Sequence, residues 1–272
     1  MPVEALITDL DGTFWAPDMS IHPSSLEVVA MLDAQAVPFV VATGRRAQGA
    51  LRGLVPAGLD DRAAILMNGA LARDSARGES FLVDAISTRD ALDVVGIFEQ
   101  AGLEPIVYVD HPETDMVIGP RPSAGKQFLA SAPGVRSVSS VSQVVASTAT
   151  IGFGAFGFPK PMLDSIAHSI NAEKLATAIV AVSHFEGDHG LMIQAHDVDK
   201  QTGISAWCTR HGIEASRVAA VGDAHNDIEM LRAAAIAIVP SNANDEIKAL
   251  ADVIIPPNEE GGWEQIPSIL GL

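Results

Sequence analysis

Short apolar runs alternate with helical patterns at both ends of this 272-residue chain, and this alternation constrains the fold more than any other feature. A parallel sheet with helices on both faces is the arrangement that alternation of this kind favours. We therefore predict an α/β fold with a doubly wound parallel sheet. The predicted strands lie at residues 3–10, 39–42, 64–67, 218–221, 236–239 and 253–255, and the predicted helices at 24–35, 45–54, 201–211, 228–234 and 245–251. Ser24 and Glu27 are expected to form a capping box at the first helix.

The middle of the chain follows a different pattern, in which several predicted strands are not separated by helices. Residues 178–183 and 191–194 predict two such strands, and the short polar link at 186–190 predicts a hairpin between them. We expect an α+β domain inserted into the core. Residues 1–80 and 196–272 would form the core, and residues 81–195 the inserted domain.

Two carboxylates, Asp9 and Asp11, stand where the first predicted strand ends in Gly-Thr. The two-residue period of a strand would place both side chains on the same side of the chain. In open α/β sheets, ligands bind at this end of the strands. Such a pair can act as nucleophile and proton donor, or it can hold a cation such as Mg²⁺. A simple turn rich in Asp and Gly is the structural alternative.

Phosphate-binding groups are expected at two further places. Thr43 and Gly44 end the second predicted strand, where a hydroxyl and a backbone N–H can bind a phosphate oxygen. Lys200 precedes a predicted helix, and its ammonium is a compact charge well suited to phosphate. An ordinary strand terminator and a solvated lysine are the respective alternatives.

Three oxygen-bearing side chains follow the predicted strand at 218–221, namely Asp223, Asn226 and Asp227. Oxygen ligands at this spacing suit a hard cation. Asn226 or Asp227 would also serve as a cap for the helix that follows, and this role is compatible with metal binding.

The ordered set Asp-x-Asp-Gly-Thr, Thr-Gly-Arg, Lys and Gly-Asp-x-x-Asn-Asp resembles the haloacid dehalogenase (HAD) superfamily. It is most similar to the Cof-type hydrolases, whose C2 cap domain is inserted between the Thr and Lys motifs. The resemblance spans nearly the whole chain, including Asn242 and the run at 258–261 near its end. The family usually has Gly directly after the Lys, whereas Gln201 and Thr202 stand before Gly203 here.

The resemblance implies a Mg²⁺-dependent phosphatase that hydrolyses a small phosphorylated metabolite, such as a sugar phosphate, through an aspartyl-phosphate. Asp9 would be the nucleophile and Asp11 the general acid and base, while the inserted cap would select the substrate, with contacts from residues 110–113 and 185–189. The remaining implied roles are metal binding by Asp9, Asp11 (through its backbone carbonyl) and Asp223, phosphate binding by Thr43, Gly44 and Lys200, support from Asn226 and Asp227, and candidate substrate contacts at Arg45 and Asn68. A phosphotransferase or phosphomutase, or a non-catalytic protein that binds phosphometabolites, are the alternatives on this fold.

Composition excludes several other classes. The 17 basic and 34 acidic residues give a net charge of −17, which argues against nucleic acid as a partner. A single cysteine, Cys208, excludes an intrachain disulfide and fits a reducing, cytoplasmic location. We expect no signal peptide, because the first strand begins almost at once, and no membrane span, because no uncharged apolar run reaches roughly 20 residues. A monomer and a homodimer are both compatible with the sequence.

Overall fold

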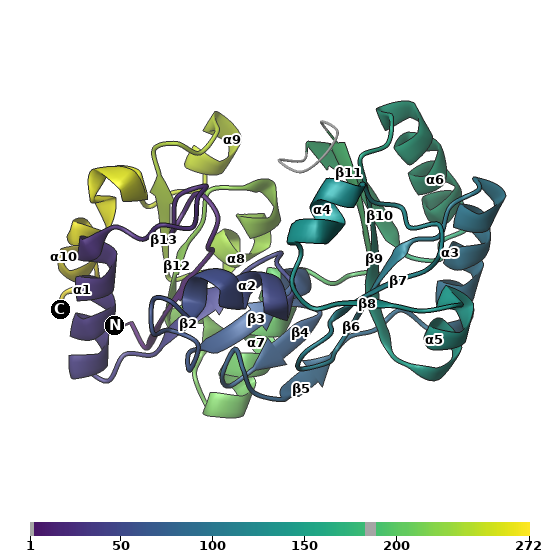
Figure 1. The fold of residues 1–272 in the computed structure, drawn as a ribbon. Helices are drawn as coiled ribbons and strands as arrows, with labels where there is room; N and C mark the ends of the chain where they lie inside the picture. The colour runs from purple at the N-terminus through teal and green to yellow at the C-terminus, as the bar shows by residue number, and fades with distance from the viewer. Residues whose placement is uncertain (1–2, 183–188) are drawn as a thin grey trace. The chain divides into compact units, whose positions relative to one another are not determined.

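The computed structural model describes residues 3–182 and 189–272 (Figure 1). Residues 185–188 of the expected hairpin link and substrate loop lie outside this part of the chain. Two compact units are present. The first comprises Met1–Arg45, Ala50–Leu82 and Asp199–Leu272, and the second comprises Arg46–Gly49 and Val83–Val198.

The first unit contains an eight-stranded sheet of order β14-β13-β12-β1-β2-β3-β4-β5. All neighbours from β14 to β3 are parallel, and β4 pairs antiparallel with β3. The predicted fold class is therefore confirmed. The strands are β1 (Ala5–Thr8), β2 (Phe39–Ala42), β3 (Ala63–Leu66), β4 (Leu71–Arg73), β5 (Ser80–Val83), β12 (Val218–Val221), β13 (Ile236–Pro240) and β14 (Val253–Ile255).

Helices connect these strands and cover the sheet. Helices α7 and α8 contact each other, as do α1 and α10. The α-helices are α1 (Pro23–Ala34), α2 (Ala47–Leu54), α7 (Lys200–His211), α8 (Ile228–Ala233), α9 (Asp245–Lys248) and α10 (Ile266–Leu270). Short 3₁₀ turns are η1 (Met67–Gly69), η2 (Ala215–Arg217), η3 (His225–Asp227), η4 (Asn258–Glu260) and η5 (Gly262–Gln265).

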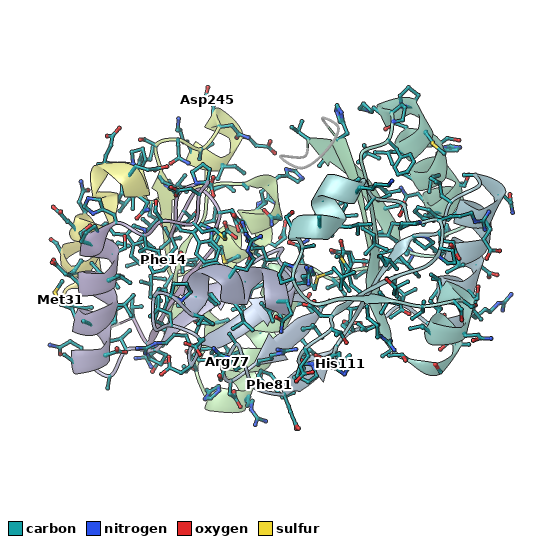
Figure 2. All side chains as sticks on the ribbon, in the orientation of Figure 1. Phe14, Met31, Arg77, Phe81, His111 and Asp245 are labelled. Carbon is teal, nitrogen blue, oxygen red and sulfur yellow. The ribbon has the colours of Figure 1, made fainter. Side chains whose placement is uncertain are left out.

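The central strands are buried on both faces, as expected of a doubly wound sheet. Ile7 of β1 and Val40 of β2 join one apolar cluster with Trp207 of α7. Phe39 points to the opposite face because successive strand residues alternate. Its ring lies 5.2 Å from that of Phe14, which Figure 2 shows inside the core.

The second unit is built on a six-stranded sheet of order β10-β11-β9-β6-β7-β8. Its neighbours are antiparallel, except that β7 and β8 are parallel. Thr177 of β10 pairs with Gln194 of β11, so the predicted antiparallel strand pair is confirmed. The strands are β6 (Ile106–Val109), β7 (Met116–Ile118), β8 (Val135–Ser137), β9 (Thr150–Phe156), β10 (Thr177–Val182) and β11 (His189–Gln194).

Helices α3 (Thr88–Gln100), α5 (Val141–Ser147) and α6 (Lys160–Ala172) supply apolar side chains to the core of this unit. Phe98 of α3, Val145 of α5 and Ile170 of α6 are buried in one cluster with Phe153 of β9. Helix α4 (Lys126–Ser131) lies near β9, where the rings of Phe128 and Phe156 are 4.9 Å apart.

The expected capping box at the first helix is wrong. Helix α1 begins at Pro23, and His22 is its N-cap residue, whose side chain accepts a hydrogen bond from the backbone N–H of Ser24. Proline is favoured in the first helical turn because its missing N–H would be unpaired there anyway. Ser24 therefore lies within the helix and cannot cap it.

Among the described residues, the longest helices are too short or too polar to cross a lipid bilayer.

Candidate active site

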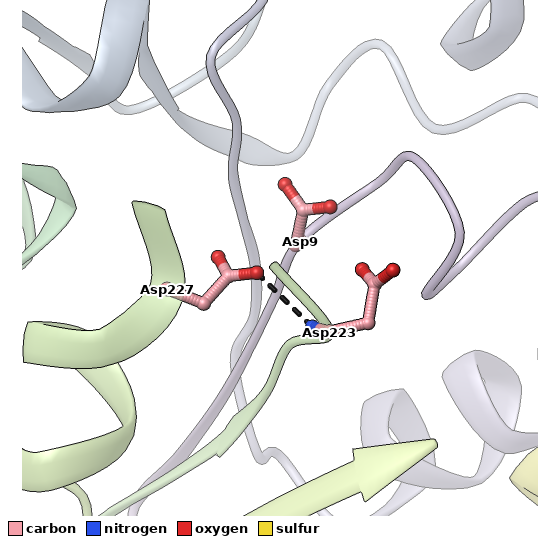
Figure 3. Close-up of side chains that lie close together, drawn as sticks. All are labelled: Asp9, Asp223 and Asp227. Atoms are coloured by element: carbon pink, nitrogen blue, oxygen red, sulfur yellow. Dashed lines mark hydrogen bonds between the residues drawn. The ribbon is translucent and has the colours of Figure 1, made fainter. Parts of the chain in front are cut away.

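The polar residues singled out from the sequence come together at the carboxyl end of the parallel sheet in the first unit. Thr8 of β1 pairs in register with Val221 of β12, so Asp9 and Gly222 follow at the same edge. Thr43 follows β2 at this edge, and Lys200 is the first residue of α7. Figure 3 shows the carboxylates of Asp9, Asp223 and Asp227 grouped together.

Lys200 is the centre of the site. Its side chain is fully buried, and Nζ donates hydrogen bonds to Asp9 Oδ1 at 2.5 Å and to Asp227 Oδ1 at 2.6 Å. Asp199 caps α7 by accepting from the backbone N–H of Thr202, which fixes Lys200 at the first helical position. The alternative of a solvated lysine is therefore wrong.

Three carboxylates form a group that could hold a metal ion. Asp9, Asp223 and Asp227 each offer one oxygen, and these oxygens lie within 4.8 Å of one another. Asp227 is fixed by the backbone, because its Oδ2 accepts from the N–H groups of Asp223 and Ala224 at 3.1 and 3.0 Å. The contacting ammonium of Lys200 balances one of the three charges. A hard divalent cation, which prefers carboxylate oxygens, fits the remaining negative charge.

Burial shapes the protonation of this cluster. Burial raises the pKa of Asp9, although the charge of Lys200 opposes the rise. Burial alone lowers the pKa of Lys200, but the charges of Asp227 and Asp9 more than offset it, so that the pKa lies above its usual value. Burial also raises the pKa of Asp223 to about 6, although the hydrogen bond from Thr13 acts to lower it.

The Asp11 carboxylate forms its hydrogen bonds with Arg45 and Trp15, whereas Asp9 binds Lys200. Strand β1 ends at Thr8, so the two-residue period does not extend to Asp11. The Asp11 carboxylate pairs with Arg45, whose Nε and Nη2 donate at 2.7 and 2.6 Å, and it accepts from Trp15 Nε1 at 3.1 Å. Burial would raise the pKa of Asp11, but these bonds and the charge of Arg45 lower it below its usual value.

The loops after β2 and β3 meet beside Gly44. Asn226 Nδ2 donates to Asn68 Oδ1 at 3.0 Å, and a Cβ atom on Gly44 would lie 2.9 Å from that same oxygen. Thr43 is buried, and its hydroxyl accepts from the backbone N–H of Arg45 at 3.1 Å. Gly44 therefore leaves room for two amide side chains that come from distant parts of the chain.

Asn68 lies in a strained turn. Met67, Asn68 and Gly69 have φ angles of 51°, 52° and 101°, a left-handed region that costs non-glycine residues free energy. A Cβ atom on Gly69 would lie 1.8 Å from the carbonyl oxygen of Asp199, so this turn packs directly against the start of α7.

Two residues of the site carried no predicted role. Thr13 Oγ1 donates to Asp223 Oδ1 at 2.5 Å, and Asn242 Nδ2 donates to the carbonyl oxygen of Gly12 at 3.0 Å. Gly12 has φ +77°, and a Cβ atom there would lie 2.6 Å from Asp223 Oδ2. Thr13 and Asn242 both lie within segments noted in the sequence, but the Thr13–Asp223 and Asn242–Gly12 hydrogen bonds each join residues more than 200 positions apart and have no local signal.

Comparison with known proteins establishes the family. A model of the haloacid dehalogenase-like hydrolases matches residues 6–265. The chain belongs to this family. Pyridoxal phosphate phosphatase YbhA of Escherichia coli K12 is 26% identical over 276 residues, covering 95% of each chain. These matches confirm the resemblance to the HAD superfamily and the expected enzyme class, a phosphatase.

Solved structures of the HAD superfamily share the fold. TM0651 of Thermotoga maritima aligns with a TM-score of 0.82 at 19% identity, over 99% of this chain and 97% of its own. The HAD sugar phosphatase BT4131 aligns with a TM-score of 0.76 at 24% identity, over 98% of this chain and 99% of its own.

Lys200→Met tests the ammonium that contacts Asp9 and Asp227. The variant leaves two buried carboxylates without their counter-charge, so we expect the free energy of unfolding in EDTA to fall by about 3–5 kcal/mol. Urea denaturation at pH 7.5 measures this loss. Lys160→Met is the matched control, because Lys160 forms an exposed ion pair with Asp164 and should lose less than about 1 kcal/mol. Equal losses in the two variants would contradict the central role of Lys200.

Proposed function

We propose that this protein is a Mg²⁺-dependent phosphatase that hydrolyses a small phosphorylated metabolite through an aspartyl-phosphate on Asp9. The observation that carries the proposal is the buried Lys200 ammonium between Asp9 and Asp227, beside the Asp223 carboxylate. A lysine held in this way can neutralise phosphoryl oxygens at the nucleophile. Phosphoryl transfer depends mainly on such positioning and charge stabilisation.

In the first step, Asp9 attacks phosphorus. Its Oδ1 is engaged by Lys200, which leaves Oδ2 as the attacking oxygen. A bond forms between this oxygen and phosphorus while the bond from phosphorus to the substrate's alcohol oxygen breaks. Asp11, in its protonated form, gives its proton to the departing oxygen, and the products are the free alcohol and the aspartyl-phosphate.

In the second step, Asp11 acts as a base. It removes a proton from a water molecule that attacks the phosphorus, and the bond to Asp9 breaks to release inorganic phosphate. The pairing with Arg45 favours the ionised form of Asp11, which suits this step. The acid role in the first step requires Asp11 to leave Arg45 when the substrate is bound.

The other site residues would hold the phosphoryl group and the cation. Thr43, Gly44 and Lys200 would bind the phosphoryl oxygens. Asp9, the Asp11 carbonyl and Asp223 would ligate Mg²⁺, which when bound adds positive charge where the transferring oxygens gather. Asn226 and Asp227 would support this arrangement, and Arg45 and Asn68 are candidates for contacting the rest of the substrate.

The substrate class is supported by the relatives. YbhA is a pyridoxal phosphate phosphatase, and BT4131 is a sugar phosphatase. We infer that this chain acts on a similar small phosphomonoester in the cytoplasm. The second unit, which is inserted between Thr43 and Lys200 in the sequence, would serve as the cap that selects the leaving group.

Phosphate release from a panel of phosphorylated metabolites tests the proposal. Pyridoxal 5′-phosphate and hexose phosphates come first, each with Mg²⁺ and with EDTA and without an added acceptor alcohol. We expect release that requires Mg²⁺, and Asp9→Asn should lower kcat by at least about a thousandfold because the nucleophile is lost.

Asp164→Asn is the control for this substitution, because the exposed Asp164 pairs only with a lysine on its own helix among the contacts described. It should retain full activity. Substantial turnover by Asp9→Asn would contradict the nucleophile assignment. Turnover that appears only when an acceptor alcohol is added would indicate a phosphotransferase.

The raised pKa of Asp223 predicts how pH affects Mg²⁺ binding. This pKa is about 6 in the folded protein, above the ordinary carboxyl value of 3.8, so protonation contributes stability that is fully present below pH 3.8 and is lost as pH rises through 6. Mg²⁺ must displace this proton at low pH. We therefore expect the increase in Tm caused by Mg²⁺ to be small at pH 5 and larger at pH 7.5. The increase should be weak at both values for Asp223→Asn, and an equal increase at both values for the wild type would refute this explanation.

A further inference from the structure

Trp263 connects the C-terminal segment to the proposed metal site through two consecutive hydrogen bonds. Its side chain is 1% exposed, and its Nε1–H donates to the carbonyl oxygen of Thr13 at 3.0 Å. The hydroxyl of Thr13 in turn donates to Asp223 Oδ1 at 2.5 Å. Trp263, which is 250 positions from Thr13 in the sequence, is therefore linked to a carboxylate of the site through a single intervening residue.

The indole of Trp263 is held firmly in place. Its ring packs edge-on against Phe14 at 4.9 Å and against Phe39 at 6.2 Å. The preceding Gly262 leaves no room for a side chain, because a Cβ atom there would lie 1.8 Å from the carbonyl oxygen of Pro256. These contacts fix the direction of the Nε1–H group, and so they fix the Thr13 backbone that accepts from it.

The Thr13 hydroxyl is well placed to orient Asp223. It occupies Oδ1, while Gly12 leaves space beside Oδ2, and Asn242 Nδ2 lies 3.5 Å from that second oxygen. A hydrogen bond that fixes one oxygen of a ligating carboxylate sets the direction of the other. Removing a hydrogen-bond partner of this kind often lowers metal affinity by about 10- to 100-fold.

We propose that Trp263 is a positioning residue for the divalent cation, acting through Thr13 on Asp223. The proposal rests on the metal site of the proposed function. Loss of the Nε1–H would let the Thr13 segment shift, so that its hydroxyl no longer holds Asp223 in the direction required for the ion.

Trp207 provides a matched comparison in the same unit. Its side chain is 3% exposed and packs in the core around α7. Within the described part of the chain, its Nε1 has no hydrogen-bond partner. Replacement of either tryptophan by Phe removes similar buried volume, but only the change at Trp263 removes a hydrogen bond toward the site.

The test measures Mg²⁺ binding without substrate, by isothermal titration calorimetry, and Mn²⁺ binding by electron paramagnetic resonance. We expect Trp263→Phe to weaken the binding of both ions by about 3- to 10-fold, which is less than the effect of removing a direct hydrogen-bond partner of Asp223. Trp207→Phe should change affinity by less than about twofold. Thermal unfolding in EDTA measures how much each substitution destabilises the fold without metal. If the role of Trp263 were purely structural, Trp263→Phe and Trp207→Phe would both lower the Tm without a separate effect on ion affinity.

Substitutions of Thr13 test the second hydrogen bond. Thr13→Val removes the hydroxyl and should weaken Mg²⁺ binding by about 10-fold or more. Thr13→Ser keeps the hydroxyl and should retain nearly wild-type affinity. Adding Trp263→Phe to Thr13→Val should cause little further loss, because both act through the same contact. If Trp263→Phe fails to fold, 3-benzothienylalanine at position 263 keeps the ring size and replaces only the N–H with sulfur.

Equal Mg²⁺ affinity in Trp263→Phe, Trp207→Phe and the wild type would overturn the proposal, as would additive losses in the double variant. A wild-type protein that binds neither ion would overturn both this proposal and the metal site on which it rests. Tight binding without phosphate release from any substrate would count against the proposed function alone, because the binding test uses no substrate.

Discussion

The buried ion pairs of Lys200 are the interaction on which the site depends. An ammonium with no exposed surface is stable only when carboxylates compensate for its lost hydration, and Asp9 and Asp227 do so at 2.5 and 2.6 Å. The same contacts bring the end of β1, the start of α7 and the turn before α8 to one point. The charge that stabilises this point of the fold is therefore the charge that the proposed chemistry uses.

The parallel sheet explains why residues so far apart in sequence share one site. Parallel strands present their carboxyl ends at a single edge, and Asp9 and Asp223 follow neighbouring strands there. Tight packing supports the same edge, since a Cβ atom on Gly12 would meet the Asp223 carboxylate and one on Gly69 would meet the Asp199 backbone. The fold thus provides the proximity, and small residues allow the loops to approach each other closely.

The sequence predicted the sheet and the polar residues at its edge well, because both follow from local patterns. Apolar runs mark the strands, and the side chains after them must lie near one another once the strands are parallel. The partner of the Asp11 carboxylate could not be predicted, since Arg45 stands 34 residues away and strand β1 already ends at Thr8. The bond from Trp263 to Thr13 was equally inaccessible, because it joins distant segments and depends on packing around Phe14.

Chemical trapping of the intermediate is the most direct test of the central claim, that Asp9 carries the phosphoryl group. The enzyme would be mixed with its best substrate and Mg²⁺, quenched in acid within milliseconds and treated with borohydride, which reduces an aspartyl-phosphate to homoserine. The account predicts homoserine at position 9 by peptide mass spectrometry, and none when substrate is omitted. Homoserine at another aspartate, or phosphate release in a single turnover with residue 9 unmodified, would contradict it.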